Sequence, residues 1–271
     1  MMNFKEICFG FTVMIMSSCS VAVEDIQVDE PELLSVPAEI PALPDGAYLL
    51  SSVTVTEGSE ISQLKRKQIK IYTNGRFMYA FNNALTDNID VGAGDATWSN
   101  GVMIEVPRVN HDGPVSGYSF DVDIDQTENG FEQTIIGMKY EDGRVLDMVE
   151  QWDTVSRDIS EYDGLWKLKS RSPAISGTDD STVYNETKMI GGGHFIWLNN
   201  VRFQNEKSQN FGFGSFSVDE SGTAVETAMV SSMSDYEGSV NEIKIELIDD
   251  NTLQQTHVEG KTSITQIYER M

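Results

Sequence analysis

Alternation of apolar and polar residues is the dominant pattern after residue 45. In 120–124, apolar residues alternate with aspartates, and in 243–247 they alternate with a lysine and a glutamate. A period of two with one polar face is typical of half-buried antiparallel strands. The runs 77–81 and 195–198 are apolar on both faces, which predicts strands that are covered on both sides.

Turn-forming residues separate these runs. Six dipeptides favour tight turns: Asn74-Gly75, Asn100-Gly101, Asn129-Gly130, Asp142-Gly143, Ser221-Gly222 and Asp250-Asn251. Roughly eight short strands in about 110 residues indicate a sandwich or an up-and-down barrel. Because closure leaves no exposed edge, a meander of hairpins favours the barrel. One short helix over 57–67 is the only helix that we expect.

The chain repeats itself. Residues 45–82 recur at 163–200 without a gap, at a constant offset of 118. Eight of the 38 aligned positions are identical, where average composition would give about two. The identical pairs are Asp45/Asp163, Gly46/Gly164, Leu50/Leu168, Ser52/Ser170, Lys70/Lys188, Gly75/Gly193, Phe77/Phe195 and Asn82/Asn200. We therefore expect two copies of one unit, at 45–157 and 163–271.

The first 19 residues have the features of an export signal. Lys5 precedes an apolar run at 7–16, which is shorter than the roughly 20 residues that a bilayer requires. The sequence Met16-Ser17-Ser18-Cys19 resembles the lipobox of bacterial lipoproteins, in which Cys19 would become the lipidated N-terminus. The alternative is an ordinary cleaved signal peptide with an incidental cysteine. Cys8 is the only other cysteine, so we expect no disulfide in the mature chain.

Residues 20–44 have the composition of a flexible tether. They contain four of the seven prolines and many acidic residues, which favours an extended and solvated segment. We therefore expect an exported cell-envelope lipoprotein, held at the outer membrane and facing the periplasm or the cell surface. The membrane would be contacted through the lipid on Cys19, since a net charge of −24 argues against binding to anionic lipid or nucleic acid.

Short motifs at equivalent places in the two copies carry a family resemblance. Gly46-Ala47-Tyr48 and Gly164-Leu165-Trp166 resemble the Gly-x-Trp that begins the first strand of lipocalins. Each copy continues with a strand that starts near Lys70 or Lys188 and is followed by a glycine-rich strand, at 92–94 or 212–214. The pattern is similar to that of bacterial lipocalin-like secreted proteins and lipoproteins of unknown function, here as a tandem duplication.

The resemblance implies a fold and one specific contact. The fold is all-β, with two tandem lipocalin-like antiparallel up-and-down β-barrels after the signal peptide and tether. In lipocalins a late arginine packs across the early tryptophan, so Arg270 would lie over Trp166. The first copy has Thr154 and Tyr48 at the matching positions, so this contact is not expected there.

No motif indicates catalysis or a cofactor. The chain contains no Gly-x-Ser-x-Gly and no His-Glu-x-x-His, so we expect a protein that is not an enzyme. His194 and His257 could lie on neighbouring strands, but the first copy has Arg76 and Ile135 there and no third ligand is evident, which disfavours a metal or haem site. The acidic run 121–125 alternates like a strand and lacks the glycine of a calcium loop.

The barrel interiors are the remaining candidate for a site. Glu105 and Glu226 stand at roughly equivalent positions, as do Gln133 and Gln255, and a polar residue repeated in both copies is either a buried ligand contact or part of an outward face. The candidate ligand-binding residues are Tyr79, Glu105, Gln133, His194, Trp197, Glu226, Gln255 and His257.

Two functions are consistent with these observations. The first is non-catalytic binding of a small apolar or amphipathic molecule in one or both barrels. The second is a structural or protein-interaction module whose barrels are filled by side chains, with an unknown protein partner. The volume of the barrel cavities would distinguish them.

Overall fold

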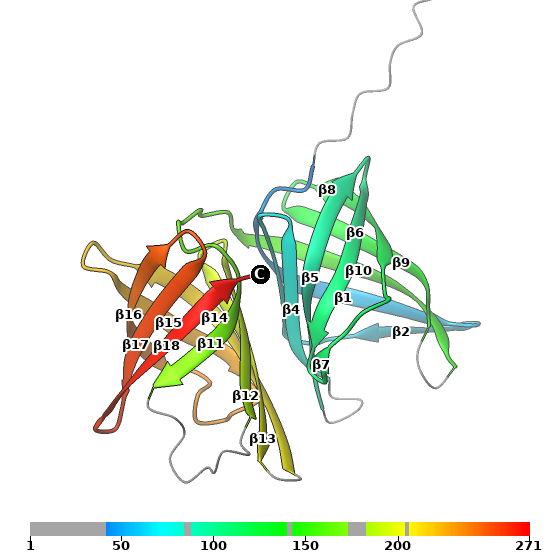
Figure 1. Ribbon diagram of the computed structural model, residues 1–271. Coiled ribbons are helices and arrows are strands. Elements are labelled where there is room, and N and C mark those ends of the chain that lie inside the picture. The colour runs from blue at the N-terminus through cyan, green and yellow to red at the C-terminus, as the bar shows by residue number, and fades with distance from the viewer. Residues whose placement is uncertain (1–41, 84–87, 140–142, 173–182, 204–205) are drawn as a thin grey trace, which may run out of the picture. The chain divides into compact units, whose positions relative to one another are not determined.

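The computed structural model describes residues 42–83, 88–139, 143–172, 183–203 and 206–271 (Figure 1). The signal and most of the tether, with Cys19, lie outside the described residues. Regular structure within the described residues consists of strands alone, and no helix there is long and apolar enough to span a bilayer. The short helix expected over 57–67 was wrong, because Glu60–Leu64 forms strand β2 and pairs with β1 across the turn at Gly58.

The first copy forms a closed antiparallel barrel of eight strands, which β10 closes by pairing with β1. The order around the barrel is β1-β3-β4-β5-β6-β8-β9-β10, while β2 pairs with β1 and β7 with β6. The bounds are β1 Gly46–Glu57, β2 Glu60–Leu64, β3 Gln68–Thr73, β4 Arg76–Asn83, β5 Asn88–Ser99, β6 Val102–Asn110, β7 Gly113–Pro114, β8 Phe120–Thr127, β9 Gly130–Lys139 and β10 Val145–Ser156.

The second copy forms a closed barrel in which the eight strands follow chain order, as the up-and-down expectation required. Its bounds are β11 Gly164–Ser172, β12 Val183–Gly191, β13 His194–Phe203, β14 Glu206–Val218, β15 Thr223–Ser231, β16 Val240–Asp249, β17 Thr252–Glu259 and β18 Thr262–Arg270. The all-β fold of two tandem eight-stranded barrels is therefore confirmed.

The two barrels share irregularities as well as regular pairing. β1 and β11 each shift register against the last strand, between Leu50 and Ser52 in one copy and between Leu168 and Ser170 in the other. The shift lies at the same aligned position in both copies, so the repeat extends to the bulge that bends the first strand.

The glycine-rich strands are explained by close approach. A Cβ on Gly92 would lie 2.7 Å from the ring of Tyr79, and one on Gly212 would lie 2.8 Å from the indole of Trp197. Two residues later, a Cβ on Gly94 or Gly214 would lie about 2 Å from a carbonyl oxygen of the next strand. Each glycine therefore makes room for either an aromatic ring inside the barrel or the adjacent backbone.

One face of the doubly apolar strands points into a barrel and the other into a shared apolar cluster. Phe77 belongs to the interior of the first barrel, whereas Met78 and its equivalent Ile196 belong to a cluster with residues of both barrels. Further equivalent pairs in that cluster are Ala47/Leu165, Ile71/Met189, Ala80/Leu198, Val91/Phe211 and Ala93/Phe213. The expected covering of these strands on both sides is confirmed, and equivalent faces of the two barrels supply it.

The arginine contact implied by the lipocalin resemblance is present. The Arg270 guanidinium lies 4.1 Å from the ring centroid of Trp166, and the indole nitrogen donates to the backbone oxygen of Tyr162 at 2.9 Å. In the first barrel Tyr48 donates instead to the backbone oxygen of Pro44. The acidic run in β8 has its aspartates exposed and Val122 and Ile124 buried, as its alternation predicts.

Candidate functional site

A buried lysine, glutamate and glutamine are bonded together inside the first barrel. Lys70 of β3 donates to Glu105 Oε1 of β6 at 2.9 Å and to Gln133 Oε1 of β9 at 2.8 Å. All three residues are no more than 6% exposed. Tyr72 also donates to Glu105 Oε1, at 2.5 Å. Burying a charge is costly unless it is paired and hydrogen bonded, and these contacts meet that requirement.

The second barrel contains the same set at the equivalent positions. Lys188 of β12 donates to Glu226 of β15 and to Gln255 Oε1 of β17, the latter at 3.0 Å. Gln255 then donates to Gln266 Oε1 at 2.9 Å and to the Tyr268 hydroxyl at 3.0 Å. The polar residues repeated in the two copies therefore face inward, and the outward alternative for them was wrong.

A second carboxylate lies beside each of these sets. In the first barrel Glu150 of β10 accepts from Gln133 at 2.9 Å, from the Trp152 indole at 3.2 Å and from Arg66 at 2.7 Å. Burial raises the pKa of Glu150, and the nearby Lys70 and Arg66 oppose that rise.

The corresponding acid of the second barrel is Glu186 of β12. It accepts hydrogen bonds from the hydroxyls of Tyr184 and Tyr268. Burial is the main cause that raises the pKa of both tyrosines, and the charge of Glu186 adds to it. The two phenols therefore stay protonated and donate at neutral pH.

Aromatic and cationic side chains cover these polar layers. In the first barrel the Arg66 guanidinium lies 4.0 Å from the ring centroid of Phe81 while it holds Glu150. In the second barrel Tyr236, from the loop between β15 and β16, packs edge-on against Trp197 with 5.3 Å between the ring centroids. Each interior thus contains a hydrogen-bonded polar layer with an aromatic or cationic side chain packed beside it.

The remaining candidate residues are not bonded to the lysine, glutamate and glutamine of either barrel. Tyr79 donates to Asp90 Oδ1 at 3.2 Å, and burial raises the pKa of both groups. His194 is buried at the start of β13, where its Nδ1 lies 2.8 Å from the backbone oxygen of Gly192, and burial lowers its pKa. His257 lies on β17, which neighbours β16 and β18.

The two histidines therefore do not come from adjacent strands, because β13 pairs with β12 and β14. The sequence left open whether their strands are neighbours, and the strand order of the barrel excludes it. In the part of the chain that the structure describes, no group of three or more histidine, cysteine or acidic residues is arranged to hold a metal ion.

Lys70 and Lys188 belong to these buried sets, and the list of candidate residues missed both. Both were among the identical pairs of the repeat, and a lysine kept at the same aligned position of a strand was the signal that could have found them. They connect the glutamate and the glutamine in each barrel, which sequence spacing alone does not place together.

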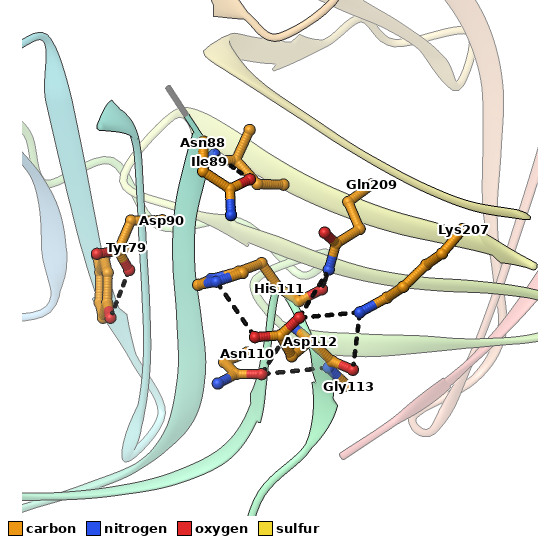
Figure 2. Close-up of polar contacts among 10 residues, drawn as sticks. All are labelled: Tyr79, Asn88, Ile89, Asp90, Asn110, His111, Asp112, Gly113, Lys207 and Gln209. Atoms are coloured by element: carbon orange, nitrogen blue, oxygen red, sulfur yellow. Dashed lines mark hydrogen bonds and ion pairs between the residues drawn. The ribbon is translucent and has the colours of Figure 1, made fainter. Parts of the chain in front are cut away.

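A pocket of about 280 Å³ lies outside the barrel interiors, with walls from β6, the β6–β7 turn, β11, β12, β13 and β14. Its edge is drawn in Figure 2, where Lys207 of β14 reaches Asp112 of the β6–β7 turn. The Lys207 Nζ lies 2.9 Å from Asp112 Oδ1, and this hydrogen bond is the main cause that lowers the pKa of Asp112. Gln209 donates to the backbone oxygen of His111 beside it.

Comparison with known proteins adds little to this description. Neither a family model nor a curated protein matches the sequence. Three solved chains match by structure. One is a protein of unknown function from the DUF3598 family of Nostoc punctiforme, at 12% identity over 83% of this chain and 96% of that one, with a TM-score of 0.24. A likeness at that score carries no functional argument.

Proposed function

We propose that this protein is a non-catalytic module of the cell envelope in which two side-chain-filled barrels form a rigid support for binding at their outer surface. The observation that carries the proposal is the bonded lysine, glutamate and glutamine inside each barrel, covered by Arg66 in one and by Tyr236 in the other. Small barrels are either filled by side chains or hold one small ligand. A filled interior leaves the exterior as the place for recognition.

A second candidate is binding of a small apolar or amphipathic molecule inside one or both barrels. It is favoured by the repetition of the same buried ionisable set in both copies, since groups that are costly to bury are often retained for function. A ligand would have to displace Arg66 or Tyr236 to reach that layer.

The attachment to the membrane is part of the same proposal. The lipobox-like sequence at Cys19 and the acidic, proline-rich tether support a lipoprotein held at the outer membrane. The lipocalin relationship is supported by the eight-stranded antiparallel barrels and by Arg270 over Trp166. A Cys19→Ser variant should move from the membrane fraction to the soluble fraction, and unchanged membrane recovery would contradict the anchor.

Native mass spectrometry after incubation with a cell-envelope extract tests where recognition occurs. Tyr79→Phe and Trp197→Phe change the interior side chains conservatively, and both should retain any mass that the unmodified protein carries. No bound mass in any of the three proteins would also support filled barrels. If the unmodified protein carries a bound mass and Tyr79→Phe or Trp197→Phe loses it, the proposal is overturned in favour of an interior ligand.

A further inference from the structure

The pocket outside the barrels has a charge opposite to that of the chain. The chain contains 43 acidic and 19 basic residues, yet four cationic side chains line this one pocket: Arg108, Lys167, Arg202 and Lys207. Two acidic residues also line it, Asp112 and Glu186. The Glu186 carboxylate is buried and accepts from Tyr184 and Tyr268, and among the described residues it forms no ion pair with the four cations.

Two of the four cations are held in place by neighbouring carboxylates. Arg108 donates to Asp95 Oδ2 through Nε at 2.8 Å and through a terminal nitrogen at 2.6 Å. Lys207 is held by Asp112 at 2.9 Å (Figure 2). These contacts orient one guanidinium and one ammonium at the pocket without filling it.

The other two cations of the pocket, Lys167 and Arg202, can contact a ligand. Among the residues that the structure describes, Lys167 and Arg202 are exposed and form no ion pair. Arginine presents paired donors that match the oxygens of carboxylate and phosphate groups. Two unpaired cations that face one pocket, on a chain of net charge −24, are the arrangement that an oxyanion would neutralise.

The rest of the wall suits an organic group rather than a bare ion. Val109, Val201 and Met271 supply apolar surface, and Asn200 lies among them. The Asn200 Oδ1 atom is buried and has no hydrogen-bond partner in the structure. Buried polar atoms almost always have a hydrogen-bond partner, so a bound ligand would supply the one that is missing here. The side-chain amide can present either its oxygen or its nitrogen to that ligand.

We propose that this pocket binds a small amphipathic anion, in which a phosphate or carboxylate group contacts Lys167 and Arg202 and an apolar part lies against Val109 and Val201. The inference rests on the proposed function, because it names the chemical class that the outer surface would recognise. The volume of about 280 Å³ fits a molecule with one small ring. The acidic remainder of the surface would repel a long polyanion, which limits the class to small molecules.

Isothermal titration of the full chain with phenyl phosphate, benzoate and benzyl alcohol tests the proposal. Phenyl phosphate or benzoate should bind with a Kd of about 0.1–1 mM, and the neutral alcohol at least about tenfold more weakly. The stronger of the two anions identifies the oxyanion. Lys167→Gln combined with Arg202→Gln should weaken anion binding at least about tenfold.

The matched control is Lys65→Gln combined with Lys261→Gln, which removes two exposed lysines outside the pocket and changes the net charge equally. This control should keep the affinity within about twofold. No anion binding, or equal weakening in the two double variants, would overturn the proposal that the pocket binds an anion. The proposal of filled barrels would still stand. Loss of binding in Trp197→Phe alone would place the anion inside a barrel and overturn both proposals.

Discussion

The two barrels keep one part of their polar interior constant and hold the second acid in different ways. Lysine, glutamate and glutamine occupy equivalent places in both. In the first barrel the second acid is Glu150 on the last strand, β10, and a glutamine, Gln68, lies on β3. In the second barrel the positions are exchanged: the acid is Glu186 on β12, and the glutamine is Gln266 on the last strand, β18. Arg66 neutralises Glu150, whereas hydroxyls hold Glu186.

This exchange shows what the interior requires. In the first barrel Arg66 donates to both Gln68 and Glu150, and in the second Gln266 donates to Glu186 directly. Either strand can therefore supply the acid as long as a donor accompanies it. Arg66 has that role in the first barrel, and Tyr184 has it at the equivalent position, 118 residues later, in the second. The lysine is common to both sets, but in the first barrel the Tyr72 hydroxyl also donates to its glutamate.

Removing that lysine should have the largest effect, and more in the second barrel. Lys188→Met leaves Glu226 without its donor and should lower the free energy of unfolding by about 3–5 kcal/mol. Lys70→Met should cost less, about 2–3 kcal/mol, because Tyr72 still donates to Glu105. Urea titration followed by tryptophan fluorescence measures both.

The control for this pair is Lys188→Met combined with Glu226→Met, which removes both charges. It should recover at least about half of the lost stability, since an apolar pair avoids an unpaired buried charge. Equal costs for the two lysine variants would mean that the Tyr72 hydroxyl does not compensate in the first barrel.

The paired glycines should rank next, and they should behave alike in the two barrels. Gly94→Ala and Gly214→Ala each place a Cβ against a backbone carbonyl that cannot move alone, and should cost about 2–4 kcal/mol of unfolding free energy. Gly92→Ala and Gly212→Ala meet a ring that can shift, and should cost about 1–2 kcal/mol. Thermal denaturation of the four variants gives the ranking, and a reversed order would contradict the assigned contacts.

The smallest expected effect concerns pH and is confined to the first barrel. The pKa of Glu150 is raised above its ordinary value of 4.5, so the folded protein binds this proton more tightly than the unfolded chain does. Its contribution to stability is therefore complete below about pH 4.5 and is lost as pH rises through the folded pKa. Glu150→Gln should remove this slope.

Urea midpoints of the Glu150→Gln variant between pH 4 and 8 measure the change in slope. Glu132→Gln is the matched control, because it changes a partly buried glutamate of the neighbouring strand for which no comparable burial occurs. An unchanged pH profile in Glu150→Gln would show that Arg66 and Lys70 already keep this carboxylate ionised.

Much of the architecture could be predicted because it depends on local patterns. Alternation defined strands such as 120–124, and the repeat defined two equivalent units. The doubly apolar strand at 77–81 correctly implied covering on both sides. The helix over 57–67 was mispredicted, because pairing with β1 decides the conformation of Glu60–Leu64 and propensity does not.

From the repeat alone, Glu105 and Gln133 could be matched with Glu226 and Gln255 of the second copy. Their inward direction and their contacts with Lys70 and Lys188 depend on the closed barrels, because alternation separates the two faces of a strand without indicating which face is enclosed. The outer pocket likewise depends on closure and packing. Its cations lie at 108, 167, 202 and 207, and folding, rather than spacing in the chain, brings them together.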